Sequence, residues 1–492
     1  MTGVATQATP TGRHAIAHVR EFLGDSVTPL ALYRRLAELS PVRFLLESVT
    51  GGEQVSRFSF LGAAPRKLYR LYPDRLEVQD TGAGSGDRVR LPGVPLAALE
   101  RVLGSVRSGD GPVPFAGGFV GFFGYDLIRL IETLPNRPPD PFDLPVAVIG
   151  RFDTVLAVDH ARQRVLAVAN EIEGEVSQEQ ANADLDRMAE LLRGGVTEHA
   201  ASMPRGTIVA ADLGPASLSG EQYRAAVERA KEHIAAGDIF QVVLARRWKT
   251  RDAPAPLLLY RALRAVNPSP YMVLLELPDV ALVGASPEML VRKSGRRAET
   301  RPIAGTRPRG QDAESDRALA ADLLADEKER AEHVMLVDLG RNDLGRVATA
   351  GGVKVETFME IERYSHVMHI VSSVAAELPE KTTALDALLA CFPAGTVSGA
   401  PKIRAMQIID TLEPEARGPY AGAVGYASFS GDLDTCITIR TLVVRNGETS
   451  VTAGAGIVAD SDPATEERET ENKAAALLQA VALARALEAE ER

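Results

Sequence analysis

The chain has 492 residues, of which 45% are hydrophobic and 25% charged, with 42 glycines and 30 prolines. These fractions are typical of soluble globular proteins and argue against disordered, collagen-like and coiled-coil classes. The formal net charge of -11 repels a phosphate backbone, so no nucleic-acid partner is expected. Any anionic ligand must therefore be held by a local site.

Cysteine content and hydropathy indicate where in the cell the protein is located. The two cysteines, Cys391 and Cys436, are too few for a disulfide framework and lack the CxxC spacing of a zinc or redox site. No apolar run approaches the roughly 18 residues needed to cross a bilayer, and the N-terminus has no apolar export core. We expect a cytoplasmic protein without a membrane association.

The N-terminal part predicts short strands separated by turns. Residues 43–159 contain the strand-like segments RFLLES, SRFSFLG, KLYRLY and VAVIGRFDTVLAVD. The most polar connection follows, and residues 177–195 within it predict a helix that ends at Gly194. We therefore divide the chain into an N-terminal region (1–170), a linker with a helix (171–214) and a C-terminal region (215–492).

The C-terminal region mixes both kinds of element. Ser219 and Gln222 have the spacing of a capping box before a helix that Gly237 ends, and DIFQVVLARRW then predicts a strand. Further strands (YMVLLEL, ALVGAS, DTCITIRTLVV, TSVTAGAG) alternate irregularly with helices (AADLLADEKERAEHVMLVDLG, TALDALLACF, PKIRAMQIIDTL, TEERETENKAAALLQAVALARAL). This order predicts an α+β fold with large mixed or antiparallel sheets and flanking helices.

Common nucleotide and hydrolase motifs are missing. GTVSGAPK (395–402) fails the phosphate-loop spacing, and AGAGIVAD (453–460) lacks the third glycine of a dinucleotide fingerprint. The chain has no HExxH and no GxSxG motif.

Two acidic helices suggest a metal. Glu329 and Glu332 share one helix face, and Glu466 and Glu469 repeat the spacing. Like charges one turn apart repel, and Mg²⁺ prefers carboxylate and water ligands. Two solvated helix faces would give the same pattern, so both interpretations stay open.

Loops and strand ends hold further candidates. Several glycines flank predicted strand ends. They could let backbone N–H groups bind an anion, or they could simply form turns. Arg440 ends the apolar segment DTCITIR and suits a bidentate carboxylate contact. His369 could be a general base or a core histidine.

Together these segments resemble the chorismate-utilising enzymes, most closely the anthranilate synthase large subunits. The resemblance is dense over about residues 215–490 and sparser before it. It rests on NPSPYM (267–272), GASPEML (284–290), RPIAGTRPRG (301–310), ERAEHVMLVDLGRNDLGRV (329–347), YSHVMHIVSSV (364–374), FPAGTVSGAPKIRAMQIID (392–410), YAGAVGYASFSGDLDTCITIRT (420–441) and AGAGIVADSDPATEERETENKA (453–474).

The resemblance implies roles for individual residues. It implies Mg²⁺ as cofactor, with Glu332 and Glu469 as ligands and Glu329 and Glu466 beside them. It implies that Glu288 assists departure of the ring hydroxyl and that His369 serves the later loss of pyruvate, with Thr396 in the same pocket. The chorismate contacts it implies are Gly305, Thr306, Tyr426, Arg440, Gly454, Ala455, Gly456 and Lys473.

The implied reaction joins chorismate and ammonia to give anthranilate and pyruvate, the first committed step of tryptophan synthesis. Relatives that use water carry a lysine where this chain has Gln241, and many aminodeoxychorismate synthases carry one at the position of Ala304. An aminodeoxychorismate synthase component and a non-catalytic tryptophan sensor remain the alternatives.

The resemblance also implies an effector and a partner. It makes residues 1–170 a regulatory region and 215–492 the chorismate-binding domain. A tryptophan site is implied at Glu47, Ser48, Pro270, Tyr271 and Met272. Because neither cysteine lies in a nucleophile turn, glutamine would be used only through a separate amidotransferase subunit, in a heterotetramer.

Overall fold

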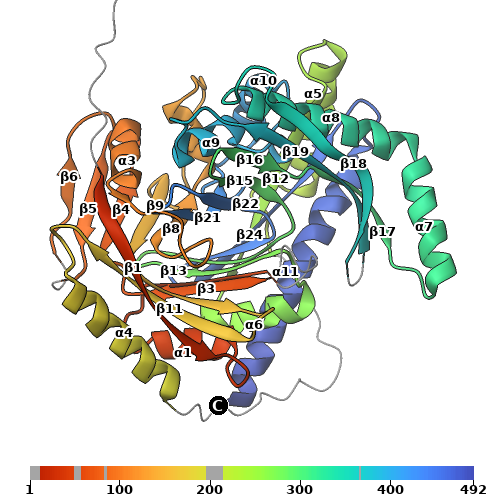
Figure 1. The fold of residues 1–492 in the computed structure, drawn as a ribbon. Helices are drawn as coiled ribbons and strands as arrows, with labels where there is room; N and C mark the ends of the chain where they lie inside the picture. Colours follow the sequence, from red (N-terminus) through yellow and green to blue (C-terminus); the bar gives the residue numbers. More distant parts are fainter. Residues whose placement is uncertain (1–11, 49–56, 83–85, 195–213, 365–366, 492) are drawn as a thin grey trace, which may run out of the picture.

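The computed structural model describes residues 12–48, 57–82, 86–194, 214–364 and 367–491. Two large sheets pack face to face, and helices cover their outer faces (Figure 1). This arrangement confirms the predicted α+β class. Within these ranges, no helix is long and apolar enough to cross a membrane.

The first sheet has twelve strands, and its pairs are antiparallel except for β1 with β7. Its order is β20 (Gly399–Ala400), β12 (Gln241–Arg251), β24 (Glu448–Ile457), β23 (Thr441–Arg445), β14 (Ala281–Ser286), β13 (Tyr271–Glu276), β2 (Arg43–Glu47), β3 (Phe58–Ala63), β10 (Thr154–Asp159), β11 (Arg164–Ile172), β1 (Arg13–Leu23) and β7 (Val106–Arg107).

The second sheet also has twelve strands, with β18 (Val353–Arg363) attached to β19 outside the main order. That order is β17 (Ile303–Pro308), β19 (Val367–Glu377), β16 (Arg297–Thr300), β15 (Met289–Ser294), β22 (Leu433–Ile437), β21 (Ala423–Ser428), β8 (Gly118–Phe123), β9 (Ala147–Phe152), β4 (Lys67–Leu71), β5 (Leu76–Asp80) and β6 (Val89–Leu91).

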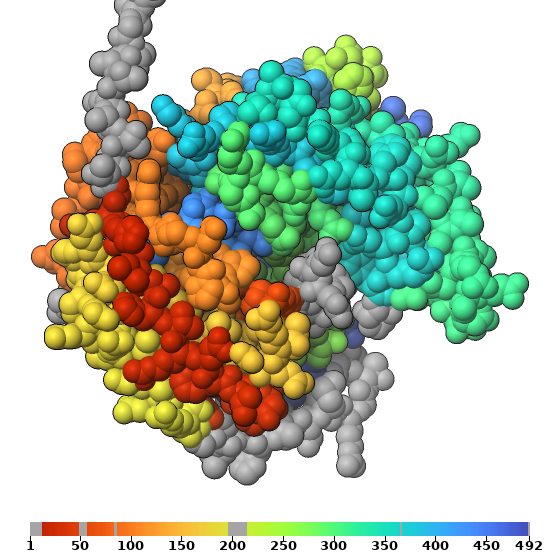
Figure 2. All heavy atoms as spheres, viewed as in Figure 1, coloured from red at the N-terminus to blue at the C-terminus, as the bar shows by residue number. Residues whose placement is uncertain are grey.

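Both sheets combine strands from both ends of the chain. In the first sheet β2 pairs with β13, and in the second β8 pairs with β21. The space-filling view accordingly shows blue C-terminal residues between orange N-terminal and green ones (Figure 2). In each sheet the strands up to residue 172 form one end and the strands from residue 241 form the other. The boundaries at residues 170 and 215 stay a prediction.

Buried apolar residues pack between the two sheets and beneath the outer helices. Phe44 and Val273 of the first sheet meet Phe122 and Val424 of the second in a core between the sheets. Helices α1 (Pro29–Leu36), α4 (Gln178–Arg193), α6 (Pro256–Val266) and α11 (Pro463–Glu491) cover the outer face of the first sheet. The remaining helices are α3 (Pro95–Leu103), η1 (Tyr125–Leu130), α5 (Gly220–Ala235), α7 (Ala313–Ala325), α8 (Glu327–Gly345), α9 (Ala384–Cys391), η2 (Gly395–Val397) and α10 (Lys402–Leu412).

Helix caps explain where the predicted helices begin and end. Ser219 and Gln222 form the expected capping box of α5, and the linker helix α4 ends before Gly194. The single helix predicted over AADLLADEKERAEHVMLVDLG is wrong, because the Asp326 side chain accepts hydrogen bonds from two backbone N–H groups and starts α8 anew after α7.

The single strand predicted over DTCITIRTLVV is also wrong. Strand β22 ends at Ile437 in the second sheet, and β23 begins at Thr441 in the first. Arg440 lies at this crossing with a φ of 49°, a conformation that ends an extended strand. The crossing matters because it brings site residues to the junction of the two sheets.

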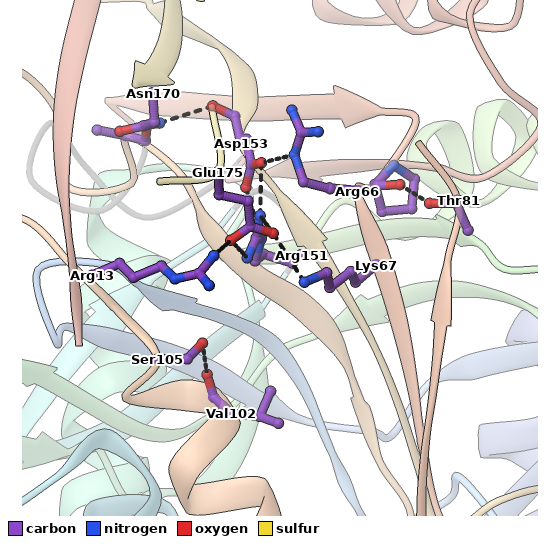
Figure 3. A network of polar contacts seen from close by, with 12 residues as sticks. Arg13, Arg66, Lys67, Thr81, Val102, Ser105, Arg151, Asp153, Asn170 and Glu175 are labelled. Atoms are coloured by element: carbon purple, nitrogen blue, oxygen red, sulfur yellow. Dashed lines mark hydrogen bonds and ion pairs between the residues drawn. The ribbon is translucent and has the colours of Figure 1, made fainter. Parts of the chain in front are cut away.

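A polar cluster links strands of the two sheets that come from the N-terminal part of the chain (Figure 3). Arg151 of the second sheet is 2% exposed and donates to both Asp153 and Glu175, at 2.9 Å for each pair. Glu175 also pairs with Lys67 of the second sheet at 2.9 Å and with Arg13 of the first at 2.7 Å. These buried charges are thus paired rather than isolated, as burial requires.

Candidate active site

A cavity of about 320 Å³ lies where strands cross between the two sheets. Its walls come from β12, β17, β24, the helices α8 and α11, and two segments that cross between the sheets, residues 287–288 between β14 and β15 and residues 438–440 between β22 and β23. The structure brings most of the expected catalytic and substrate residues here, namely Glu288, Gly305, Thr306, Glu332, His369, Thr396, Arg440, Gly454, Gly456, Glu469 and Lys473.

The two crossings lie side by side because β14 pairs with β23 and β15 pairs with β22. The backbone N–H of Ile437 donates to the Glu288 carbonyl at 3.0 Å, and the N–H of Ala285 donates to the Arg440 carbonyl at 3.1 Å. The Ser286 hydroxyl adds a bond to the Ile437 carbonyl at 2.7 Å. Glu288 and Arg440 are therefore fixed as neighbours by backbone pairing.

Glu288 carries a carboxyl suited to proton donation. Burial raises its pKa to about 7, against the smaller lowering effects of the Thr396 hydroxyl and the Arg440 charge. The Thr396 hydroxyl lies beside this carboxyl but has no full hydrogen bond among the described residues. A neutral carboxylic acid near pH 7 can act as a general acid.

Arg440 supplies the fixed positive charge of the cavity. Burial lowers the pKa of its guanidinium, whereas the charge of Glu288 raises it. An arginine remains charged in proteins even so. Its five N–H donors are therefore available for a carboxylate of a ligand.

His369 is held as a neutral base. Its Nδ1 donates to the Gly305 carbonyl at 2.9 Å and lies 3.2 Å from the Thr306 hydroxyl. Burial lowers the pKa of His369, and the positive charge of Arg440 lowers it further. The hydrogen bond to the Gly305 carbonyl raises it, but by less. With Nδ1 protonated, Nε2 is the atom able to accept a proton.

Glycines let the strand backbones approach the cavity. Gly305 has a φ of 63° at a bulge between β17 and β19, and a Cβ there would lie 2.8 Å from Leu323. A Cβ on Gly454 would lie 2.9 Å from the Tyr420 hydroxyl, and one on Gly456 would lie 2.7 Å from the Gln241 amide nitrogen. Gly305, through its positive φ, and Gly454, where a Cβ would also lie 2.9 Å from the Leu244 carbonyl, exclude larger side chains, whereas at Gly456 the flexible Gln241 side chain can move aside. Ala455 between them is fully buried on the opposite side of β24, so only its backbone could reach a ligand.

Tyr426 does not line this cavity but lines a second one, and its expected contact with the substrate stays a prediction. Residues 424 and 426 of β21 face the core between the sheets, where the Tyr426 ring lies 4.5 Å from that of Phe115. Tyr420, in the turn before β21, lines the cavity instead. No periodic pattern marks a turn residue, so sequence reasoning missed it.

The expected metal ligands come from two helices. Glu332 of α8 and Glu469 of α11 line the cavity, whereas Glu329 and the buried Glu466 do not. Glu469 pairs with Lys473 at 2.6 Å. Within the described residues no three acidic, histidine or cysteine side chains are already gathered as a metal site.

The charges of these carboxylates nevertheless fit a cation. Burial raises the pKa of Glu332, and the neighbouring Glu329 and Glu469 raise it further. Burial also raises the pKa of Glu466, with Glu469 adding to the effect. Carboxylates that repel one another beside a cavity are relieved by a bound divalent cation.

A second cavity, of about 240 Å³, contains all five expected tryptophan-site residues together with Tyr426. Tyr260 donates to the Glu47 carboxylate at 2.5 Å, and the Tyr271 hydroxyl donates to Asp434 at 3.1 Å. The Ser48 hydroxyl is buried and has no partner among the described residues. Phe58, Phe60 and Met272 supply apolar walls. The site combines an apolar slot with a few polar groups, as small-molecule sites do.

Comparison with known proteins identifies the family. The sequence model of the chorismate binding enzyme family matches residues 42–479, which is most of the chain. The chain belongs to the chorismate binding enzymes. Its relatives include anthranilate synthase component 1 of Thermus thermophilus, 48% identical over 95% of this chain and 98% of that protein, and the Pseudomonas aeruginosa protein of that name, 47% identical over 94% and 95%.

Solved structures agree with this family. Anthranilate synthase component I of Streptococcus pneumoniae superposes with a TM-score of 0.76 at 38% identity, covering 86% of this chain and 92% of the other. The isochorismate synthase MenF of Escherichia coli shares the fold, with a TM-score of 0.70 at 19% identity over 97% of this chain and 96% of the other.

Proposed function

We propose that this protein is the chorismate-converting subunit of an anthranilate synthase, which makes anthranilate and pyruvate from chorismate and ammonia. The observation that carries the proposal is the cavity that joins Glu288, His369 and Arg440 in a chain 48% identical to such a subunit. The absence of a lysine at two cavity positions, occupied by Gln241 and Ala304, favours ammonia, which needs no activating base.

Chorismate is a dianion, and the cavity offers it two kinds of positive group. Arg440 would bind one carboxylate, with the backbone at Gly454 and Gly456 beside it. Glu332 and Glu469 would hold Mg²⁺, which supplies a Lewis acid for the other carboxylate. The protein's net charge of -11 makes these local charges necessary.

In the first half-reaction ammonia adds to the ring and the ring hydroxyl leaves. Hydroxide is a poor leaving group, so the neutral carboxyl of Glu288 donates a proton and the hydroxyl departs as water. In the second half-reaction the ring proton is removed, the enolpyruvyl group leaves as pyruvate and the ring becomes aromatic. Nε2 of His369 is the base available for that proton.

The test is an assay of the purified chain with chorismate, Mg²⁺ and ammonium at alkaline pH. We expect anthranilate fluorescence that disappears when EDTA removes the metal. Consumption of chorismate without anthranilate would point to an aminodeoxychorismate or isochorismate product. Binding without consumption would support a sensor instead.

The second cavity supports tryptophan as a feedback inhibitor. Glu47 would hold its ammonium group, and the apolar walls would hold its indole. Glu47→Gln removes this charge. The tryptophan concentration that halves the variant's own uninhibited rate should therefore be at least about tenfold higher than in the wild type. Unchanged inhibition in Glu47→Gln would remove tryptophan from this cavity.

Glutamine use requires a partner. Both cysteines are buried, and burial raises the pKa of the Cys391 thiol and, to about 12, that of Cys436. A buried protonated thiol is a poor nucleophile. We therefore assign glutamine hydrolysis to a separate amidotransferase subunit.

A further inference from the structure

Lys473 occupies an unusual position between the acidic helix and the substrate strand. Its ammonium lies 2.6 Å from Oε1 of Glu469 and donates to the Gly454 carbonyl at 2.9 Å. One contact is to an expected metal ligand, and the other is to the backbone expected to bind chorismate. The same side chain thus links both halves of the site.

The surroundings make this ammonium the local counter-charge. Two lysines, Lys328 and Lys473, lie near the carboxylates of Glu332 and Glu469 that line the cavity. Of these two cations, only Lys473 contacts a cavity carboxylate among the described residues. Lys328 lies on the exposed start of α8. Without Lys473, Glu332 and Glu469 would face one another uncompensated.

We propose that Lys473 is a place-holder for the divalent cation: it neutralises Glu469 in the metal-free protein and must leave that carboxylate when Mg²⁺ binds. This inference rests on the proposed function, because it takes Glu469 to be a metal ligand. An ammonium and a metal ion cannot share one carboxylate oxygen without repulsion. The released ammonium, still beside Gly454, is then free for an anionic substrate.

The place-holder lowers the affinity of the empty site for metal. Metal binding must break a charged hydrogen bond that substrate-free protein already has. A substrate carboxylate would take over the ammonium and remove this competition. Metal and substrate would therefore strengthen each other's binding, and the coupling would be reciprocal.

The test measures metal binding without turnover. Mn²⁺ is titrated into the substrate-free full chain, and bound Mn²⁺ is read from the loss of the free-ion electron paramagnetic resonance signal. Lys473→Met keeps the length of the side chain and removes its charge, so it should bind Mn²⁺ about tenfold tighter than the wild type. A gain in affinity cannot result from misfolding.

Matched variants separate displacement from general electrostatics. Lys328→Met removes a nearby cation that touches no ligand carboxylate, and it should change Mn²⁺ affinity by less than about threefold. Lys473→Arg keeps the charge and should stay near the wild type. Equal gains in Lys473→Met and Lys328→Met, or no gain in Lys473→Met, would overturn the place-holder while the metal site stands. Failure of every variant to bind Mn²⁺ would overturn the metal assignment and the inference with it.

Discussion

At the scale of single residues, the chemistry depends on two groups in unusual protonation states. Burial raises the pKa of Glu288 to about 7, whereas burial and the charge of Arg440 lower the pKa of His369 and favour its neutral form. One site therefore contains an acid and a base that are both ready near neutral pH. Neither state follows from residue type alone.

Glu288 gives a prediction about pH. Its raised pKa means that the acid form is lost as pH rises through about 7, so kcat/KM at constant free ammonia should fall on that side of the profile. Glu288→Gln cannot donate this proton and should lose about 10²- to 10⁴-fold in kcat with no titration near pH 7. A profile that stays unchanged in Glu288→Gln would assign the proton to another group.

At the scale of elements, the crossings between sheets explain both the success and the failure of sequence reasoning. Motif resemblance located Glu288 and Arg440 correctly in the cavity, because their segments are distinctive. Sequence reasoning predicted one strand where the structure has β22 and β23, because a continuous apolar segment does not indicate that the chain passes from one sheet to the other. It named Tyr426 and not Tyr420, although Tyr420 lines the cavity, because the two tyrosines lie in one motif and only tertiary packing separates their directions.

A buried arginine organises the elements that form one wall. Arg417 is 5% exposed and pairs with Glu413, and it donates to the carbonyls of Val397 at 2.6 Å and Val243 at 2.7 Å, both cavity residues. Its guanidinium also lies over the Tyr420 ring, 5.7 Å from the centroid. Arg417 is therefore a positioning residue for the loop with Thr396, strand β12 and Tyr420.

Lysine cannot reproduce this fork of donors. Arg417→Lys should lower kcat/KM by about 10- to 100-fold, largely through the KM for chorismate, because the wall moves while the acid and base remain. Arg247→Lys is a matched control, since Arg247 is also buried but pairs with Glu415. Equal kinetic losses in the two variants at a temperature where both are folded would show that Arg417 has only a structural role.

At the scale of the whole molecule, stability depends on joining the sheets. Each sheet joins a block of N-terminal strands to a block of C-terminal strands, through β2 with β13 in the first sheet and β8 with β21 in the second. We expect residues 215–492 expressed by themselves to lack the partners of β13 and β21 and to expose the core between the sheets. Sequence analysis did not predict this joining of two blocks of strands, because strand pairing over such distances leaves no local pattern.

The polar cluster around Glu175 makes the stability of the joined sheets depend on pH. Burial raises the pKa of Glu175, but Arg151 and Lys67 outweigh it and lower the pKa to about 2. A carboxylate with a lowered pKa stabilises the fold above its unfolded value of about 4.5 and loses that effect as pH falls toward 2. Glu175→Gln should cost about 3 kcal/mol near pH 7, and thermal unfolding should show this difference shrinking below about pH 4. A constant difference across that range would contradict the cluster's role.

The central claim is that one cavity joins ammonia to chorismate and then expels pyruvate. The most direct measurement supplies the purified chain with chorismate, Mg²⁺ and ¹⁵N-ammonium, without glutamine, and determines the products by mass. We predict anthranilate containing ¹⁵N and an equal amount of pyruvate. A labelled product that retains its enolpyruvyl group, or pyruvate without labelled anthranilate, would contradict the account.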